Sequence, residues 1–416
     1  MRSDGGRIAL PADRNIFDLR DSDNGFRPPG TRPAREEGPM EEFDVAVVGL
    51  GALGSAAAYH LARAGIRTVA FEQFELGHVR GASHDTSRIV RTSYGSPEYV
   101  RFAQAAYREW AALEADTGER LLTVTGGVVF IPDAGPYDAD DFARSLTENG
   151  VPYELLDPDE VRARWPQFDV PAGVTTVYTP DSGIAHAART VATLQMHARM
   201  RGAVLRDRTR VDALVPVDGG VVVATSAGDV RARRVVVAAD AWTSALLEPL
   251  GIHIPLEVMQ EQVSYFAPAE PADFAPERFP VWIWEDEQNF YGFPTYGEPT
   301  IKAARDVSEN LMSPDERTFV PSPERVAELS AFLSARIPGS GALLRTVTCQ
   351  YALTPGRRFV LGALREHPDI VVGLGAGHAF KFTPAFGLGL AELAIGQGTT
   401  DDLTAFAVDA TAAPAL

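Results

Sequence analysis

The chain has 416 residues, one cysteine and a formal net charge of −18. Its length suggests two or three domains with a large core. The negative charge argues against a broad surface for nucleic acid or anionic membrane, because phosphates are bound by clustered cations. No apolar run approaches the roughly 20 residues that span a bilayer. A single cysteine allows no internal disulfide, which fits a cytoplasmic location.

Sequence signals of metal and serine-nucleophile chemistry are missing. The eight histidines are scattered, and no His-Glu-x-x-His or Cys-x-x-Cys spacing occurs. The Gly-x-Ser-x-Gly turn that presents a catalytic serine is also missing. We therefore expect no metal site.

The first 42 residues mix Gly, Pro, Arg and Asp without a sustained hydrophobic period. They contain no apolar stretch typical of a secretory signal. We predict a disordered or loosely attached arm that is dispensable for folding.

The next segment predicts a βαβ unit. Residues 45–48 read as a short buried strand, residues 52–64 carry small and apolar side chains at helical density, and residues 68–71 read as a second strand. A Gly-x-Gly-x-x-Gly sequence joins the first strand to the helix, and an acid follows the second strand. This order is typical of dinucleotide binding, but it does not choose between FAD and NAD.

Each residue of this motif has a mechanical role. Gly49 permits a tight turn, Gly51 lets a pyrophosphate approach the backbone, and Gly54 lets the helix pack closely on the strand. The helix N-terminus offers free N–H groups to the phosphates. Glu72 can accept hydrogen bonds from ribose hydroxyls.

Residues 231–247 and 369–396 repeat the plan of a strand, a turn and a helix. We therefore expect a discontinuous nucleotide-binding domain over residues 43–120, 176–250 and 341–410. The β-prone, proline-punctuated residues 121–175 and 251–340 predict a substrate domain on a mostly antiparallel sheet. The expected fold class is α/β, in an α+β two-domain arrangement whose first domain is Rossmann-like.

Five stretches spread over residues 43–406 together resemble one family. They are the glycine motif, SHDTSRIVR (83–91), YGFPTYGEPTIK (291–302), VTCQY (347–351) and GHAFKF (377–382). They resemble the FAD-dependent amine oxidases of the monomeric sarcosine oxidase and N-methyltryptophan oxidase group, within the D-amino-acid-oxidase-like superfamily. The resemblance implies an FAD-binding domain, an amino-acid substrate, dioxygen as acceptor and a monomer.

Cys349 is the only cysteine. A lone cysteine is most often a small buried hydrophobe, but the family's matching cysteine carries the flavin through a thioether. The resemblance thus implies FAD bound covalently through Cys349, and the alternative is a buried thiol beside non-covalent FAD. His84 and Arg88 correspond to residues beside the flavin, although Arg88 could equally brace its loop.

The resemblance also implies catalytic roles. Arg91 and Lys381 match a pair that holds the substrate carboxylate, a task suited to arginine's forked donors. Lys302 matches a lysine over the flavin that promotes reaction with oxygen, because a nearby cation stabilises superoxide. His378 and Tyr291 match residues that line the substrate pocket.

The chain departs from the family at Asp306, which stands where sarcosine oxidase has a histidine. An acid there could recognise a basic or cyclic amine, with Arg91 as its expected ion-pair partner. Trp282 and Trp284 either add aromatic bulk near the pocket wall or pack in the core, and the sequence favours neither place. These departures make a cyclic imino acid of the pipecolate type, or an N-methyl aromatic amino acid, at least as good a candidate as sarcosine.

The leading hypothesis is a flavin-dependent oxidase of a secondary or N-methyl amino acid that forms an imine and hydrogen peroxide. A nicotinamide-dependent dehydrogenase, supported by the glycine motif alone, is one alternative. A flavin-binding protein without turnover is another, suggested by Gly356 and Arg358 in place of the family's acidic and histidine residues.

Overall fold

The computed structural model describes residues 40–408. The predicted arm over residues 1–42 therefore lies outside the described residues except for its last three. The helices of the described part are α1 (Ala52–Arg63), α2 (Pro97–Thr117), α3 (Ala139–Glu148), α4 (Pro158–Arg164), α5 (Ala187–Met200), α6 (Thr243–Leu247), α7 (Pro323–Arg336) and α8 (Thr383–Ile395).

The first sheet is the predicted nucleotide-binding sheet, and its central strands are parallel. Its order is β10-β11-β12-β1-β2-β9, and β19 pairs with both β12 and β18. Its strands are β1 (Glu41–Val48), β2 (Thr68–Phe71), β9 (Val204–Arg206), β10 (Val211–Val217), β11 (Gly220–Thr225), β12 (Val230–Val237), β18 (Val360–Ala363) and β19 (Ile370–Leu374).

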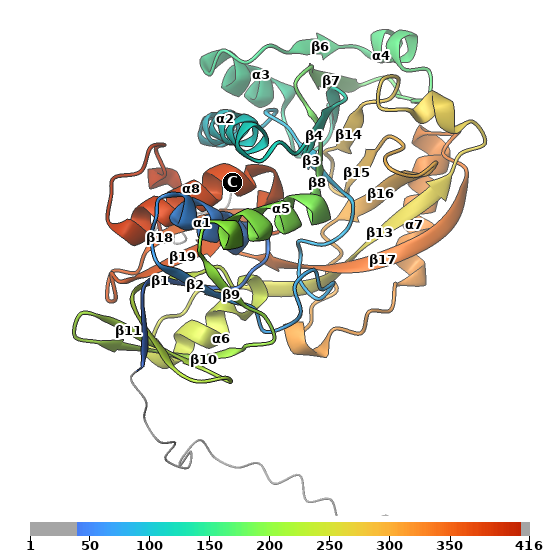
Figure 1. Cartoon of the computed structure of the whole chain (residues 1–416). Coiled ribbons are helices and arrows are strands. Elements are labelled where there is room, and N and C mark those ends of the chain that lie inside the picture. Colours follow the sequence, from blue (N-terminus) through green and yellow to red (C-terminus); the bar gives the residue numbers. More distant parts are fainter. Residues whose placement is uncertain (1–39, 409–416) are drawn as a thin grey trace, which may run out of the picture. The chain divides into compact units, whose positions relative to one another are not determined.

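Both faces of this sheet are buried, as the continuous apolar runs of β1 and β12 require. Side chains alternate along β1: Val45 and Val47 enter a core with α1, α2 and α8, whereas Ala46 and Val48 enter a second core with Leu247 of α6. Figure 1 shows α1, α5 and α8 on one side of the sheet and α6 on the other. The glycine turn at the end of β1 therefore lies at the carboxyl edge of a covered parallel sheet, where such folds bind ligands.

The second sheet is antiparallel except where β14 pairs with β5. Its order is β17-β13-β16-β15-β14-β5-β7-β6. Its strands are β5 (Gly127–Pro132), β6 (Glu154–Leu156), β7 (Val174–Thr179), β13 (Glu257–Ala267), β14 (Val281–Trp284), β15 (Asn289–Phe293), β16 (Ile301–Asp306) and β17 (Ala342–Leu353). A small third sheet orders β3 (Ser87–Val90), β8 (Gly183–His186) and β4 (Leu122–Val124).

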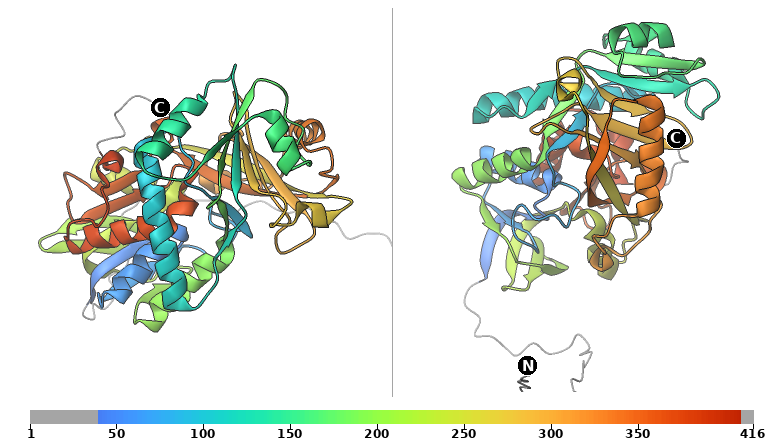
Figure 2. Two further views of the ribbon diagram at one scale, coloured as in Figure 1. Left: turned by 90° about the horizontal axis from the view of Figure 1, so that it is seen from above. Right: turned by 90° about the vertical axis from the view of Figure 1, so that its right-hand side faces the viewer.

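Helix α7 covers one face of the second sheet, as the right-hand view of Figure 2 shows. Leu329 and Leu333 of α7 share a core with Ile301 and Ala303 of β16. Because strand side chains alternate, Lys302 and Asp306 of β16 lie on the opposite face. That opposite face is the one available to a site between the two sheets.

The fold class is confirmed: a Rossmann-like sheet and a mostly antiparallel sheet occur as expected. The assignment of residues to two domains stays a prediction. Strand β17, expected in the nucleotide-binding domain, forms its ladder with β13, so by its hydrogen bonds it belongs to the second sheet. Within residues 40–408, none of the helices has the length and apolar character needed to cross a membrane.

Candidate active site

The glycine turn has the geometry that its sequence predicts. Gly49 has a φ of 93°, and a Cβ there would overlap the carbonyl oxygen of Ala238. A Cβ on Gly54 would overlap the carbonyl of Gly49, so only glycine allows this close approach of helix and strand. The N-cap residue of α1, Gly51, has no side chain, and the first N–H of the helix, that of Ala52, donates to Ser83 Oγ at 2.9 Å. The first turn of α1 lines the cavity, where a helix N-terminus favours a pyrophosphate.

Glu72 lies at the end of β2, as expected for the ribose-binding acid. Its Oε2 accepts from the Leu50 N–H at 3.0 Å, and Oε1 accepts from the Phe74 N–H at 3.1 Å. Burial would raise the pKa of Glu72, but His78 and these backbone donors lower it overall. Glu72 is thus an ionised carboxylate that also braces the glycine turn.

A cavity of about 1450 Å³ runs from the glycine turn to the second sheet. It exceeds the roughly 300–1,000 Å³ typical of small-molecule pockets, so it has room for a dinucleotide and a substrate. Ten of the thirteen predicted site residues line it: Gly49, Gly51, Glu72, His84, Arg88, Arg91, Tyr291, Asp306, His378 and Lys381. Gly54, Lys302 and Cys349 do not line it.

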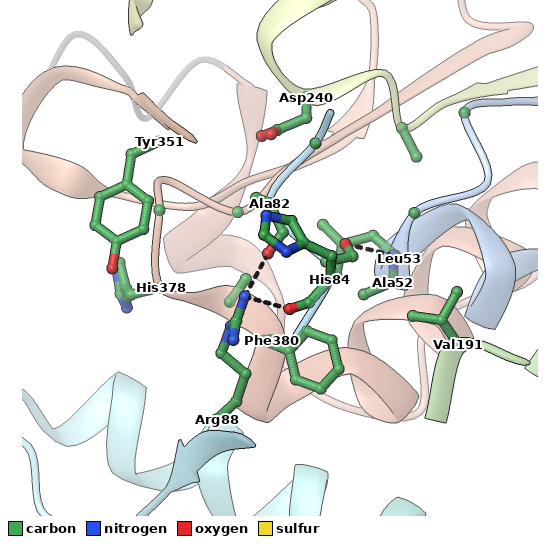
Figure 3. Close-up of a pocket in the computed structure, with 18 of the residues that line it drawn as sticks. Ala52, Leu53, Ala82, His84, Arg88, Val191, Asp240, Tyr351, His378 and Phe380 are labelled. Atoms are coloured by element: carbon green, nitrogen blue, oxygen red, sulfur yellow. Dashed lines mark hydrogen bonds between the residues drawn. The ribbon is translucent and has the colours of Figure 1, made fainter. Parts of the chain in front are cut away.

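The loop before β3 shapes the middle of this cavity. Nη2 of Arg88 donates to the carbonyl oxygens of Ala82 at 2.9 Å and His84 at 2.8 Å, as the dashed lines in Figure 3 show. Arg88 therefore braces its loop, which was one of the two roles expected for it. Burial, followed by the nearby Arg88 and Arg317, lowers the pKa of His84 to about 4.

The residues present fit a bound dinucleotide. Several buried polar atoms of the cavity wall have no hydrogen-bond partner within the described residues: His84 Nε2, Arg91 Nε, Tyr94 Oη and Asp240 Oδ2. Such atoms cost stability unless a ligand satisfies them. Asp240 was not predicted; it has a φ of 46°, and burial raises its pKa to about 6. Figure 3 shows Asp240 and His84 together at this wall.

Cys349 is buried in the middle of β17, opposite Glu261 of β13. It is two residues from Tyr351, which lines the cavity, and residues two apart share a strand face. Burial raises the pKa of the Cys349 thiol to about 11, against the pull of Arg88, Lys302 and Arg317. The thiol therefore points to the cavity side of the sheet and has three cations near it.

Arg91 and Lys381 lie together at the far end of the cavity. Their charged groups lie near the same ring, 4.4 Å and 5.9 Å from the centroid of Tyr94. Nη1 of Arg91 donates to the Ser93 carbonyl at 2.7 Å, and Nη2 lies 3.5 Å from Oε1 of Glu285. Lys381 donates to the His378 carbonyl at 2.9 Å and makes no ion pair within the described residues. Burial and the charge of Arg91 lower the pKa of Lys381 to about 7.

The expected pairing of Asp306 with Arg91 is wrong. Asp306 pairs with Arg357, whose Nη1 lies 2.7 Å from Oδ2 of Asp306. Arg357 reaches this position from a short turn after β17, where it has a φ of 54°. Arg91 is instead beside Glu285 at the end of β14. Both acids still line the same end of the cavity.

His378 and Tyr291 both line the cavity. His378 Nε2 is 2.9 Å from the Arg357 carbonyl, and burial followed by Lys381 holds its pKa well below the usual range. His378 is therefore neutral. Burial raises the pKa of Tyr291, whose hydroxyl hydrogen-bonds to Tyr351. In Figure 3 Tyr351 and His378 lie side by side at the wall.

Lys302 does not line the cavity, although it contacts Asp85 and Phe293, which do. Trp282 and Trp284 do not line it either, so core packing, one of the two alternatives left open by the sequence, is the one observed. Both indoles belong to the core under α7, because Trp282 stacks on Phe332 and lies over Gly292. The tryptophan side chains thus point to the other face of the second sheet.

Sequence reasoning missed Glu285, Arg357 and Asp240. A compositional signal exists only for the two predicted lysines, since the chain has 36 arginines and only two lysines, Lys302 and Lys381. Lys302 is buried and Lys381 is partly buried, and both lie in or near the cavity, where several arginines also lie. A lysine contributes a compact, titratable ammonium group there.

Comparisons with known proteins agree with this geometry. The model of the family FAD dependent oxidoreductase (DAO) matches residues 44–393. Monomeric sarcosine oxidase of Bacillus sp. strain B-0618 is 32% identical over 373 residues, which cover 88% of this chain and 96% of that protein. N-methyl-L-tryptophan oxidase of Salmonella dublin is 28% identical over 370 residues, covering 88% and 98%. The solved structure of NikD, an unusual amino acid oxidase essential for nikkomycin biosynthesis, is 30% identical, covers 88% of this chain and 98% of its own, and has a TM-score of 0.79.

These matches span nearly all of the described residues and settle the choice between FAD and a nicotinamide cofactor that the glycine motif left open. The chain belongs to the family of FAD dependent oxidoreductases, in the group of the monomeric sarcosine oxidases and N-methyl-L-tryptophan oxidases.

Proposed function

We propose that the protein oxidises a secondary or N-methyl amino acid to an imine, with FAD attached through Cys349 and dioxygen as the final acceptor. When bound, the flavin accepts two electrons and a proton from the C–H next to the nitrogen and then reduces dioxygen to hydrogen peroxide. The residues of the chain bind and orient the substrate, and the imine hydrolyses in water. We expect the enzyme to act as a monomer in the cytoplasm.

One observation carries this proposal: two partly buried cations with unused donors face the same end of the cavity. Arg91 has its Nε without a partner among the described residues, and Lys381 has no acid partner there. A carboxylate between them would satisfy both groups with charge-assisted hydrogen bonds. Held in this way, an amino acid presents its N-substituent or α C–H in a fixed orientation, which is the main source of rate in such a site.

The nitrogen of the substrate has complementary partners at the same end. Asp306 and Glu285 are two acids close enough to interact electrostatically with Lys381, one of the two cations proposed to bind the substrate carboxylate. Their negative charges attract an ammonium. Neutral His378 and the Tyr291 hydroxyl can each accept a hydrogen bond from that ammonium. Aromatic rings of Tyr94 and Tyr99 also line this region, which favours a cyclic or large N-substituted amino acid over sarcosine.

The proposal is tested with the purified yellow holoenzyme in a peroxide-coupled screen. The substrates are sarcosine, N-methyl-L-tryptophan, L-pipecolate and L-proline, each against the amine that lacks its carboxylate. We expect at least one amino acid to bleach the flavin under anaerobic conditions and to yield peroxide in air. Its decarboxylated partner should have a kcat/KM lower by about 100-fold, since two charge-assisted contacts are lost.

Arg91→Lys and Lys381→Met should each remove most of this discrimination. Arg67→Lys, at an exposed surface pair, is the matched control and should retain it. Equal kcat/KM values for pipecolate and piperidine, or no bleaching by any amino acid in the screen, would refute the proposed function.

A further inference from the structure

Lys302 is held in an unusual environment for a lysine. It is 3% exposed on β16, and its side chain points away from α7 toward the cavity side of the sheet. Its Nζ lies 2.6 Å from Oδ2 of Asp85 and donates to the carbonyl and the hydroxyl of Ser87 at 3.0 Å and 3.2 Å. The ammonium therefore makes two hydrogen bonds to Ser87 and one ion pair to Asp85.

Asp85 occupies a backbone conformation that suits glycine. Its φ is 81°, in a region where non-glycine residues are uncommon and cost energy. The surrounding contacts hold it there: Tyr265 Oη donates to Oδ1 at 2.5 Å, and the Ala188 N–H donates to its carbonyl at 3.0 Å. A strained residue whose carboxylate is directed at one buried lysine indicates a selected role for that carboxylate.

Every other charge near Lys302 can be named. Arg88 and His84 come from the segment before and within β3, Tyr265 from β13, and Cys349 from β17; the ring of Phe293 lies 4.9 Å away. Of these groups only Asp85 is a carboxylate in contact with the ammonium. Arg88 repels it, and burial opposes its charge. Asp85 is thus the main counter-ion of Lys302.

Without Asp85 the lysine would lose its proton readily. Burial lowers the pKa of Lys302 to about 8, even though Asp85 acts to raise it. For Asp85, burial would raise the pKa, but the ion pair with Lys302 and the Tyr265 hydroxyl keep it well below its usual range. A buried ammonium that lost its carboxylate would be neutral at pH 8.

We infer that Asp85 is a positioning residue that keeps Lys302 charged beside the flavin and thereby sustains reoxidation by dioxygen. This inference rests on the oxygen role of Lys302 in the proposed function. The two electrons and two protons pass to dioxygen and give hydrogen peroxide, with negative charge developing on oxygen first. A charged Lys302 stabilises that developing charge, and a neutral amine does not.

The two-lysine composition permits a direct measurement. Holoenzyme grown with lysine labelled at the ε-carbon should give two side-chain NMR signals, and Lys302→Met assigns them. We expect the Lys302 signal to titrate near pH 8 in the wild type. In Asp85→Asn its midpoint should fall by at least about one pH unit, because the counter-ion is lost, while the Lys381 signal moves much less.

Asp85→Gly provides a second variant that relieves the positive φ and protects against misfolding. Asp116→Asn is the matched control, since Asp116 also accepts from a tyrosine hydroxyl, Tyr59, and pairs with an arginine, Arg201, but does not line the cavity. It should leave the Lys302 midpoint unchanged.

Stopped-flow reoxidation of the reduced enzyme provides the second readout. At pH 8 both Asp85 variants should react with oxygen at least about fivefold more slowly. A fall of one unit in the Lys302 midpoint lowers the fraction of molecules with a charged Lys302 by about that factor. Anaerobic reduction by substrate should change less than about twofold. An unchanged Lys302 midpoint in both Asp85 variants overturns the inference. If Lys302→Met reoxidises as fast as the wild type, the oxygen role in the proposed function fails instead.

Discussion

Cys349 lies among charges that act on its ionisation in opposite directions. The proposed thioether needs a thiolate, and burial together with Glu261 raises the pKa of this thiol to about 11. Arg88, Lys302 and Arg317 act against this rise and favour the thiolate. Arg317 is itself fixed by the Thr348 carbonyl, one residue before the cysteine.

We therefore predict that Cys349→Ser yields an enzyme whose flavin is released on unfolding. The serine hydroxyl has a similar size but is a poor nucleophile. After acid precipitation the wild-type pellet should stay yellow and its chain mass should include one FAD, whereas the variant pellet should be colourless. Yellow colour retained in the Cys349→Ser pellet would exclude this attachment site.

Lys381 predicts a pH dependence for carboxylate binding. Its pKa of about 7 means that the free enzyme holds the ammonium below pH 7 and loses it above. The affinity for a carboxylate inhibitor such as 2-furoate should be constant at low pH. Above pH 7 it should fall about tenfold per pH unit, because Lys381 loses its charge.

The measurement is a flavin absorbance titration of the inhibitor from pH 6 to pH 9. Lys381→Met should bind the inhibitor weakly and with no such decline between pH 7 and 9. A wild-type affinity that is level across this range would show that Lys381 does not hold the carboxylate.

Residues that lie in short sequence motifs could be predicted as members of the site, whereas the ion pairs between them could not. The glycine turn, Glu72 and the two lysines could be found because each lies in a short, ordered stretch. Glu285 and Arg357 could not, since their partners Arg91 and Asp306 are 194 and 51 residues away. Two acids and three arginine or lysine side chains meet at one place, and the sequence alone does not state which acid pairs with which cation.

At the scale of elements, α1 is held in position by α8. Gly387 of α8 lies so close to Ala56 of α1 that a Cβ on it would overlap the alanine methyl group. Around this contact α1 contributes a row of buried alanines, Ala56, Ala57 and Ala58. Small residues thus bring the two helices together, and α1 carries the N-terminus that faces the pyrophosphate.

Gly387→Ala should therefore destabilise the protein by about 1–3 kcal/mol, the usual cost of forcing an extra methyl group into a packed core. It should also weaken FAD retention, measured in the Cys349→Ser background, because α1 moves with its phosphate-binding end. Gly398→Ala is the control: nothing lies within 4 Å of a Cβ there, and its stability should hardly change. Equal unfolding midpoints in urea for the two variants would contradict the tight α1–α8 contact.

The periodicity of the sequence predicted where strands occur better than it predicted which strands pair with one another. The strand character of residues 342–353 is plain, but the sheet that it joins depends on its long pairing with β13. Likewise the sequence left open whether Trp282 and Trp284 lie at the cavity wall or pack in the core. Successive side chains of β14 point to opposite faces of the sheet, and both indoles lie on the face that packs against α7.

At the scale of the whole described region, the site depends on two sheets that contribute different chemistry. The parallel sheet supplies backbone donors and a carboxylate for the nucleotide, and the antiparallel sheet supplies the thiol, the acids and Lys302. The segment containing β3 and the one containing α8 add Arg91 and Lys381 between them. The cavity therefore exists only in the fully folded protein, and cofactor binding and global stability should be linked.

A buried neutral histidine, His60, is expected to lower the free energy of unfolding as the pH falls. His60 on α1 is 6% exposed, and its Nε2 lies 3.0 Å from the Pro384 carbonyl at the start of α8. Burial, followed by the charge of Arg63, lowers its pKa from 6.5 to about 4. The unfolded chain therefore binds a proton below pH 6.5 that the folded chain accepts only near pH 4, so stability is full above pH 6.5 and declines as the pH falls.

We predict that this residue alone accounts for up to about 3 kcal/mol of the stability lost between pH 7 and pH 4. His60→Asn keeps an N–H donor for the Pro384 carbonyl and cannot be protonated, so its free energy of unfolding should fall less steeply with acid. His253→Asn, at an exposed histidine, should follow the wild type. Urea unfolding of the holoenzymes at pH 7.5, 6 and 5, followed by circular dichroism, measures the three slopes. Parallel slopes for His60→Asn and the wild type would show that the buried imidazole does not set the acid limit.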